Sequence, residues 1–370
     1  MQRILPVMTK MDLSTLSQKF RGCMLGSLLG DCLGAPYEGD SSVSKAVLQQ
    51  YFDKIEGPPF KAPIKQYTDD TAMTKCVAES LIDCRGLDPQ DMAKKFVKEF
   101  FASPRRGYGQ NVVRVFMKLK DQKCEDPFGP AKEQFDGAGS LGNGGAMRVA
   151  PVALFYHQDY PALIEKARKS ALLTHTNKLG RDGAILQAIA VYQGLQSIPS
   201  EGLDATTFIK ELMNKMHEIE DDDYGVEMEE CRPYQKQLSV ALDLLDADGN
   251  PDDINTKVCD LLGTNIAALY SVPTAVFCFL RALRPIPDIE EVMGFRLRTP
   301  SAARSSMPYL WVVTQTLLPA WREPLQGHTM ANLQFRNPSR GTVKVMLRSW
   351  ISQTVLWLPV INHEMLLCHY

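Results

Sequence analysis

The sequence predicts an all-α fold, in which many helices pack around a buried core. Two observations support this prediction. Apolar residues recur with helical spacing along most of the chain, as far as about residue 290. The long alternation of β-branched and polar residues that is typical of strands is rare. With 370 residues, the chain is long enough to bury a full-sized core.

The first helix is predicted over residues 14–33, and it carries a stripe of glycines. Gly22, Gly26, Gly30 and Gly34 stand at every fourth position, so they lie on one helix face. Each glycine weakens a helix by up to ~1 kcal/mol relative to alanine. We therefore expect the stripe to allow the close approach of a second helix, with a binding face as the alternative.

The remaining helices are expected in order at residues 69–82, 90–102, 110–119, 161–172, 180–194, 205–219, 234–245, 254–269 and 272–282. The acidic stretch at 218–230 is interpreted as a solvated loop. The stretch at 246–253 begins like a calcium-binding loop. However, Pro251 stands where that loop requires glycine, and no glutamate occupies the twelfth position. We interpret it as a turn between helices.

The composition excludes several functions. A formal charge of −2 and a pI of about 6.3 argue against a nucleic-acid surface or a basic membrane patch. No apolar run approaches the length of a membrane span. The nine cysteines form no CxxC pair, which favours reduced thiols in an intracellular protein. The N-terminus lacks the features of a secretory signal, although a weak mitochondrial presequence remains an alternative.

A glycine-rich stretch, GAGSLGNGGAMR at residues 137–148, is the first candidate site. GAGSLG matches the dinucleotide fingerprint formally, but the segment before it does not resemble the strand that this fingerprint requires. Five glycines expose backbone N–H groups just before a predicted helix, an arrangement that favours an anion such as a pyrophosphate. A long flexible turn is the alternative.

A second candidate is YTDDTAM, residues 67–73. Thr68, Asp69 and Asp70 place a hydroxyl and two carboxylates where a helix begins. Oxygen ligands of this kind suit Mg²⁺. An N-cap with acids in the first turn is the alternative, because both are common at helix starts. Glu38 and His175 are single polar residues, and alone each is more typical of a solvated loop or a structural histidine.

Taken together, these stretches resemble the ADP-ribosylhydrolase family. The similar segments cover residues 17–290 and match the family in order and spacing: FRGCMLGSLLGDCLGAPYE (20–38), YTDDTAM (67–73), GSLGNGGAMRVAP (139–151), LTHTNKLGRDGAILQA (173–188) and SVPTAVFCFL (271–280). The third type of the family, which removes ADP-ribose from serine and cleaves poly(ADP-ribose), is the most similar.

The resemblance implies a compact all-α domain that binds two Mg²⁺ ions beside the ribose and hydrolyses the ribosyl bond. Thr68, Asp69 and Asp70 match metal ligands, and Glu38 matches a mobile glutamate that takes part in acid–base chemistry. The matched substrate-binding residues are Phe135, Ala138, Gly139, Ser140, Leu141, Gly142, Asn143, Gly144, His175 and Ile266.

The implied partners are ADP-ribosylated proteins and poly(ADP-ribose), in the turnover of ADP-ribose after DNA damage. The resemblance implies no direct nucleic-acid or membrane contact, and a monomer. It also implies the nucleus and cytoplasm as compartments, with the mitochondrial matrix as an alternative. An arginine-specific ADP-ribosylhydrolase, or an inactive form that only binds ADP-ribose, are the other functions to be considered.

Two departures from the family pattern stand out. Leu141 occupies a position where the third type carries an aromatic residue, and leucine would stack less well on adenine. The late family motif SLGGDTDT, which completes the metal site, is absent. The chain after residue 300 contains all four tryptophans and no aspartate.

We hypothesise that this tail results from a change of reading frame. SLGGDTDT can be encoded so that a shift of one base yields LWVVTQTL, which is residues 310–317. The continuation IASMAGAIAGAYYG yields LPAWREPLQGHTM, residues 318–330, in the same shifted frame. We therefore predict an N-terminal extension (1–16), an ADP-ribosylhydrolase-like domain (17–290) and a divergent tail (291–370) that packs poorly.

Overall fold

The structure is a computed structural model, and it describes residues 13–38, 46–47, 50–51, 66–197, 202–221, 232–247, 249 and 251–283. Within these ranges the regular elements are helices, and the single β-bridge joins Gly142 to Ala267. The all-α prediction is confirmed. The tail and most of the N-terminal extension lie outside the described residues. None of the described helices is long and apolar enough to span a membrane.

The helices in chain order are α1 (Leu13–Gly34), α3 (Asp69–Asp83), α4 (Pro89–Ala102), α5 (Gln110–Asp121), α6 (Gly129–Lys132), α7 (Ala150–Phe155), α8 (Tyr160–Leu172), α9 (Lys178–Gln196), α10 (Ala205–Asp221), α11 (Pro233–Leu245), α12 (Pro251–Lys257) and α13 (Ala268–Arg281). Short 3₁₀ turns lie at Ala35–Tyr37 (η1), Gln134–Gly137 (η2) and Asn143–Gly145 (η3), and a π turn (η4) at Val258–Leu262.

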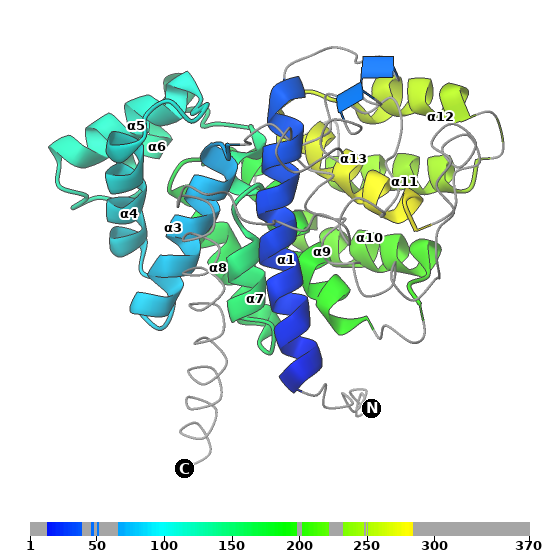
Figure 1. The fold of residues 1–370 in the computed structure, drawn as a ribbon. Coiled ribbons are helices and arrows are strands. Elements are labelled where there is room, and N and C mark those ends of the chain that lie inside the picture. The colour runs from blue at the N-terminus through cyan, green and yellow to red at the C-terminus, as the bar shows by residue number, and fades with distance from the viewer. Residues whose placement is uncertain are drawn as a thin grey trace.

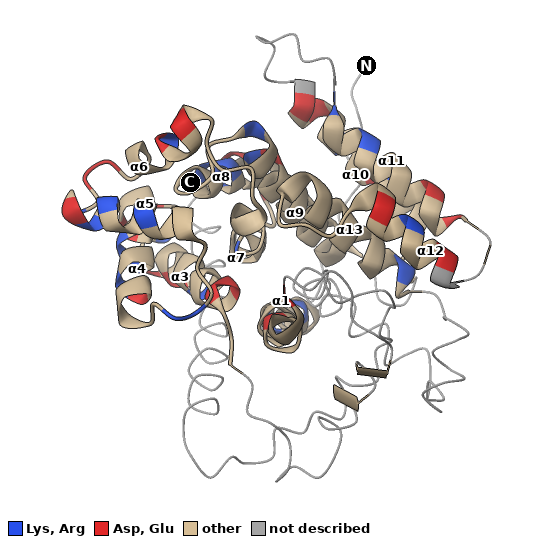
Figure 2. Cartoon of the chain, turned by 90° about the horizontal axis from the view of Figure 1, so that it is seen from above, with Lys and Arg blue, Asp and Glu red and all other residues tan. Residues whose placement is uncertain are grey.

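Helix α9 lies at the centre of the molecule. It packs against α7, α8, α10 and α13, and Figures 1 and 2 show these helices around it. The middle of α9 is apolar and fully buried, from Ala184 to Ala190 apart from Gln187. Burying each large aliphatic side chain of this kind stabilises the fold by about 1.5–3 kcal/mol. The core therefore fixes α9, and α9 in turn supports the loops at its N-terminal end.

Helix α1 runs across the front of the molecule, between the group α3–α6 and the group α9–α13 (Figure 1). It contacts α3, α7 and α9. All four glycines of its stripe are buried. Their burial agrees with the interpretation that the stripe allows close packing, since side chains at these positions would keep the neighbouring helices apart.

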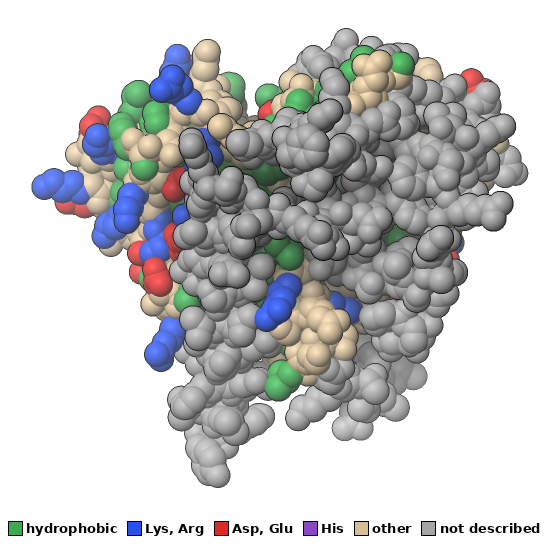
Figure 3. All heavy atoms as spheres, viewed as in Figure 1, with side chains coloured by type: hydrophobic (Ala, Val, Ile, Leu, Met, Phe, Trp, Pro, Cys, Tyr) green, Lys and Arg blue, Asp and Glu red, His purple; other side chains and the backbone are tan. Residues whose placement is uncertain are grey.

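Helices α3, α4, α5 and α6 form a lobe that carries much of the charged surface. Figure 3 shows Lys and Arg side chains over α4 and α5, mixed with acidic ones. Lys95 makes ion pairs with Asp83 at 2.9 Å and with Asp91 at 3.0 Å. Exposed pairs of this kind contribute about 0–1 kcal/mol each. This surface is a mixed solvated face.

The helix predicted at 254–269 was wrong in its second half. The structure has α12, the π turn at Val258–Leu262, and then a break at Gly263, whose φ is +81°. A residue with a positive φ cannot continue an α-helix, and glycine adopts this conformation most readily. The next helix, α13, starts at Ala268, earlier than predicted, and contains Pro273.

The acidic stretch at 218–230 was also misjudged in part. Residues 218–221 continue helix α10, and Glu220 accepts hydrogen bonds from the backbone N–H groups of Tyr234 at 2.8 Å and Gln235 at 3.2 Å. Glu220 therefore stabilises the start of α11 rather than lying in solvent. Residues 222–230 are outside the described part. The turn expected at 246–253 agrees with the structure only in part: α11 ends at Leu245, but residues 251–253 already belong to α12.

Candidate active site

The segment YTDDTAM forms the start of helix α3. Thr68 is the N-cap, and its hydroxyl oxygen accepts a long hydrogen bond of 3.4 Å from the backbone N–H of Asp70. Asp69 and Asp70 occupy the first turn, where the helix dipole favours negative charge. The capping interpretation is therefore confirmed for Thr68. It leaves open what the two carboxylates bind.

Asp31 on α1 contacts this helix start, and sequence reasoning missed it. Its carboxylate accepts hydrogen bonds from the backbone N–H of Thr68 (2.8 Å), the hydroxyl of Thr68 (2.8 Å) and the backbone N–H of Thr71 (3.1 Å). The side chain is fully buried. One signal was available, because Asp31 is the only acid between residues 14 and 37, in an otherwise apolar and glycine-rich helix.

Four carboxylates lie in this region, and the charges of some of them raise the pKa values of others. Burial, followed by the charge of Glu38, raises the pKa of Asp69 to about 7. Burial and the charges of Asp31, Asp69 and Glu38 raise the pKa of Asp70 well above its usual value. Burial also raises the pKa of Asp31 and of Glu38. Desolvation and mutual repulsion thus place a strong demand for positive charge on this site.

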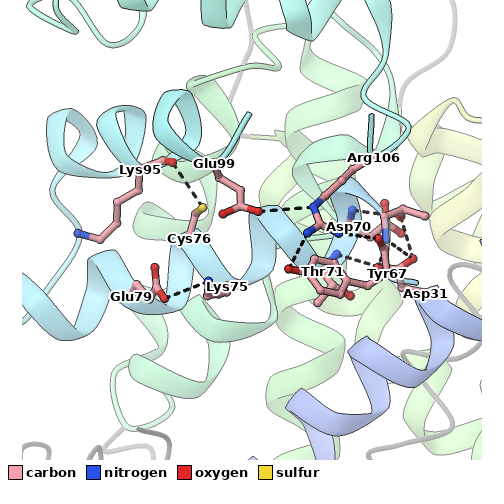
Figure 4. Close-up of polar contacts among 11 residues, drawn as sticks. Asp31, Tyr67, Asp70, Thr71, Lys75, Cys76, Glu79, Lys95, Glu99 and Arg106 are labelled. Atoms are coloured by element: carbon pink, nitrogen blue, oxygen red, sulfur yellow. Dashed lines mark hydrogen bonds and ion pairs between the residues drawn. The ribbon is translucent and has the colours of Figure 1, made fainter. Parts of the chain in front are cut away.

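The nearest arginine to the helix start does not meet this demand. Figure 4 shows Arg106 beside Tyr67, with Asp70 and Asp31 close by. The guanidinium of Arg106 donates to the carbonyl oxygen and to the hydroxyl of Tyr67, both at 3.0 Å, and lies 3.8 Å from the ring centroid. Its Nε faces Glu99 at 3.6 Å. Among the residues that the structure describes, no ion pair neutralises Asp69 or Asp70.

The backbone around Arg106 nevertheless holds the helix start in place. The carbonyl oxygen of Arg106 accepts a hydrogen bond of 2.8 Å from the backbone N–H of Asp69. Gly107 follows in a left-handed conformation with φ of +89°, and a β-carbon there would lie 3.4 Å from a carboxylate oxygen of Asp69. The loop between α4 and α5 therefore holds Asp69 in place at the start of α3.

The glycine-rich stretch forms a tight loop that lies against the N-terminal end of α9. Gly139 has φ of +72°, a left-handed conformation that favours glycine. A β-carbon at Gly180 in α9 would lie 2.5 Å from the carbonyl oxygen of Ser140. The backbone N–H of Asn143 donates to Ile266 at 2.9 Å, and that of Ala268 donates to Leu141 at 2.9 Å. The loop is therefore fixed between α9 and the start of α13.

Exposed apolar side chains border this loop. Phe135 is 52% exposed, Leu141 46% and Ile266 71%, which is unusual for large hydrophobic residues. Phe135 and Asp136 both adopt left-handed backbone conformations, with φ of 53° and 54°. Two consecutive non-glycine residues in this region represent backbone strain of the kind that gathers at binding sites. We refer to Phe135, Leu141 and Ile266 as the apolar rim.

His175 packs against the inner side of the glycine loop. A β-carbon at Gly144 would lie 2.7 Å from Cε1 and 3.1 Å from Nε2 of the imidazole. Burial, and then the charge of Arg148, lower the pKa of His175 to about 3. The imidazole is therefore neutral at pH 7. The glycine at position 144 is needed so that the ring can approach the loop backbone this closely.

Helix α3 and the glycine loop share neighbours, so they form one region. The hydroxyl of Thr74 in α3 lies 3.4 Å from the carbonyl oxygen of Met147, just after the loop. Arg148 donates to the carbonyl oxygen of Gly144 at 2.8 Å and contacts the sulfur of Met73 in α3 at 4.0 Å. The charge of Arg148 offsets a small part of the rise in the pKa of Asp69. These contacts join the first turns of α3 to the end of the glycine loop and the residues that follow it.

The fit of a metal ion can be judged from the donors themselves. Hydroxyl and carboxylate oxygens are the ligands that Mg²⁺ prefers, and the raised pKa values of Asp69 and Asp70 show that a cation would relieve their repulsion. The donor chemistry therefore fits. However, no group of three or more His, Cys, Asp or Glu side chains in the described ranges converges as a metal site.

The fold is all-α, with two acids at the start of α3 and a glycine-rich loop packed against α9, and comparisons with known proteins identify the class. The family model described as ADP-ribosylglycohydrolase matches residues 12–296. The chain belongs to the ADP-ribosylglycohydrolase family.

Individual relatives agree with this assignment. The chain is 44% identical to "ADP-ribosylhydrolase ARH3" of Mus musculus over 294 residues, which are 76% of each chain. It is 42% identical to the Homo sapiens protein of the same name, over 76% of this chain and 78% of that one. The resemblance to the third type is confirmed. The chain is therefore a glycohydrolase that acts on ADP-ribose linkages.

A solved structure supports the fold alone. An "ADP-ribosylglycohydrolase-related protein complex" aligns with a TM-score of 0.55 and 19% sequence identity, over 94% of this chain and all of that chain. At this identity the likeness shows that the helical architecture is shared. It does not extend to the residues of the site.

Proposed function

We propose that the chain hydrolyses the O-glycosidic bond of ADP-ribose attached to serine, in poly(ADP-ribose) or in O-acetyl-ADP-ribose. The observation that carries the proposal is the glycine loop, fixed between α9 and Ala268 and bordered by Phe135, Leu141 and Ile266. Its backbone N–H groups suit a pyrophosphate, and the apolar rim suits an adenine. The identity to the proteins named ADP-ribosylhydrolase ARH3 supports an ADP-ribosyl substrate, and the linkage is our proposal.

The proposed binding residues are distributed along this loop and next to it. They are Phe135, Ala138, Gly139, Ser140, Leu141, Gly142, Asn143, Gly144, His175 and Ile266. His175 and the loop backbone would hold the pyrophosphate, with Phe135 and Leu141 against the base. This orientation directs the distal ribose toward the start of α3, where Asp69 and Asp70 lie.

Glu38 is the proposed acid–base residue. It follows η1 directly, and burial and the charge of Asp31 raise its pKa. A carboxyl group whose pKa is raised in this way exchanges protons closer to neutral pH, as acid–base work on an attacking water requires.

Mg²⁺ is the proposed cofactor, with Thr68, Asp69 and Asp70 as ligands and two ions per site. When bound, the ions would supply positive charge that orients the ribose and the attacking water. The burial of the two carboxylates and the lack of a described counter-ion support this proposal. The remaining ligands belong to the motif SLGGDTDT, which the written sequence lacks.

The proposed domain limits follow from the absence of this motif. We propose that residues 17–290 form the catalytic domain and that 1–16 and 291–370 lie outside it. The reading frame is proposed to change between about residues 285 and 305. The family match ends within this stretch, at residue 296. Sequencing of the transcript across residues 285–330 tests the frame change. A frame that agrees with the genome throughout would exclude a sequence error.

A second candidate function is ADP-ribose binding without turnover. It is favoured by the lack of a converging group of three metal-binding side chains within the described ranges. The site would then keep the loop and His175 but lack the complete cation shell. An arginine-specific glycohydrolase is the third candidate, since it belongs to the same family.

One set of assays separates these candidates. Release of ADP-ribose is measured by mass spectrometry from a serine-linked and an arginine-linked peptide, with Mg²⁺ and with EDTA, beside calorimetry with free ADP-ribose. Mg²⁺-dependent release from the serine peptide supports the proposal. Release from the arginine peptide alone selects the arginine-specific function, and binding without release selects the binder.

The proposed partners are ADP-ribosylated proteins and poly(ADP-ribose), with no direct contact to nucleic acid or membrane, and a monomeric state. We place this activity in the nucleus and cytoplasm, in ADP-ribose turnover after DNA damage, with the mitochondrial matrix as an alternative. No disulfide joins the cysteines that the structure describes.

A further inference from the structure

A buried chain of hydrogen bonds ends on His175. Arg148 is fully buried and lies next to Thr174, which precedes His175. Nη2 of Arg148 lies 2.7 Å from the hydroxyl oxygen of Thr174, and that oxygen lies 2.7 Å from Nδ1 of His175. Three polar side chains thus form one line that leads from the core to the inner side of the glycine loop.

The direction of this chain follows from the chemistry of its members. A guanidinium can only donate, so the hydroxyl oxygen of Thr174 accepts from Arg148. Within the part of the chain that the structure describes, the only acceptor in reach of the Thr174 proton is Nδ1 of His175. A buried hydroxyl that left its proton unpaired would cost about 1–3 kcal/mol. Thr174 therefore donates to Nδ1.

A nitrogen that accepts carries no proton in the neutral imidazole, so the ring proton resides on Nε2. Arg148 lies on the other side of the Thr174 hydroxyl. Its positive charge disfavours a second proton on the ring, in line with the lowered pKa of His175. Nε2 lies beside Gly142 and Gly144 and has no hydrogen-bond partner among the described residues.

We propose that Arg148 and Thr174 are positioning residues that hold His175 in the Nε2–H tautomer, so that Nε2 presents a donor to an oxygen of a ligand bound at the glycine loop. The part that concerns the ligand rests on the proposed function. The tautomer itself follows from the protein alone. Arg148 also donates to the carbonyl oxygens of Gly144 at 2.8 Å and Ser170 at 3.1 Å. One side chain therefore holds both the glycine loop and the chain of hydrogen bonds that ends on His175.

His157 offers an internal reference for this assignment. Its Nδ1 lies 2.8 Å from the carbonyl oxygen of Leu154, which can only accept. His157 must therefore carry its proton on Nδ1, the opposite tautomer. Both rings are buried, with exposed fractions of 5% for His157 and 7% for His175, so solvent does not average either tautomer.

Long-range ¹⁵N–¹H NMR of the histidine rings at pH 7 tests the assignment directly. The expected spectrum has one buried ring protonated at Nδ1 (His157) and one at Nε2, which disappears in His175→Gln. In Thr174→Val, which keeps the shape but removes the hydroxyl, His175 should lose the pure Nε2–H pattern. Thr174→Ser restores the hydroxyl and should restore the pattern. An Nδ1–H pattern for His175 in the unmodified protein would overturn the proposal.

Calorimetry with ADP-ribose tests the consequence for binding. Thr174→Val should weaken binding by roughly fivefold to a hundredfold, which corresponds to about 1–3 kcal/mol for a donor turned away from its acceptor. Thr174→Ser should bind like the unmodified protein. Unchanged affinity in Thr174→Val would contradict the positioning role. If the unmodified protein itself fails to bind ADP-ribose, the proposed function fails, while the NMR result still decides the tautomer.

Discussion

Replacement of Gly180 by alanine is the sharpest structural probe of the glycine loop. A β-carbon at this position in α9 would lie 2.5 Å from the carbonyl oxygen of Ser140, and 3.3 Å from both the carbonyl oxygen of Gly142 and Cα of Leu141. These neighbours are backbone atoms, which cannot rotate away as a side chain can. Gly180→Ala therefore forces the loop away from α9.

The magnitude follows from two opposing effects. Alanine in place of glycine favours a helix by up to about 1 kcal/mol. Overpacking against a rigid neighbour costs about 1–3 kcal/mol. The unfolding free energy of Gly180→Ala should therefore lie between the unmodified value and about 3 kcal/mol below it. Because a ligand must bind to a displaced loop, its affinity should fall by roughly fivefold to a hundredfold.

Gly194→Ala is the matched control. It lies on the same helix, and a β-carbon there would meet no atom within 4 Å. It should gain up to about 1 kcal/mol of stability and bind ADP-ribose unchanged. Urea unfolding and calorimetry with ADP-ribose measure both quantities on both variants. The reasoning is refuted if Gly180→Ala binds as tightly as Gly194→Ala.

Three further predictions concern other parts of the site and the core. Arg106→Lys loses two hydrogen bonds to Tyr67 and the stacking on its ring, so urea unfolding should show a loss of about 1–2 kcal/mol; an unchanged midpoint would contradict this. Leu141→Tyr should strengthen ADP-ribose binding by about 0.5–1.5 kcal/mol through stacking on adenine, measured by calorimetry, whereas weaker binding would place the base elsewhere. Burial lowers the pKa of His157 below its ordinary value of 6.5, so protonation favours the unfolded state. Its contribution to stability is complete above pH 6.5 and is lost as the pH falls, by at most about 1.4 kcal/mol per pH unit. The difference in unfolding free energy between the unmodified protein and His157→Gln should show this slope.

The fold class could be predicted because helical periodicity records the burial of one helix face, and this signal is strong in helices such as α4, whose buried residues are Met92, Ala93, Phe96 and Phe100. The limits of single elements were less certain. The helix expected at 254–269 failed because the sequence pattern stays apolar through Gly263, while the backbone turns there with a positive φ. The apolar pattern reports which side chains are buried, and it does not report where the backbone changes direction.

The candidate site was predicted where adjacent residues carry the chemistry, as in Thr68–Asp70 and the glycine loop. Asp31 was missed because its role depends on α1 crossing the start of α3, a contact between residues far apart in the chain. Arg148 was missed for the same reason. Its partners, Ser170 and Thr174, lie more than twenty positions away, and its burial is a property of the packed core.

The central claim is that the acidic start of α3 and the glycine loop form one ADP-ribosyl hydrolase site. The most direct measurement is the release of ADP-ribose from a serine-linked peptide, for the unmodified chain, Gly180→Ala and Gly194→Ala, with Mg²⁺ and with EDTA. The account predicts Mg²⁺-dependent release by the unmodified chain and Gly194→Ala, and at least fivefold slower release by Gly180→Ala at low substrate concentration. Equal release by all three variants, or release that EDTA leaves unchanged, would contradict it.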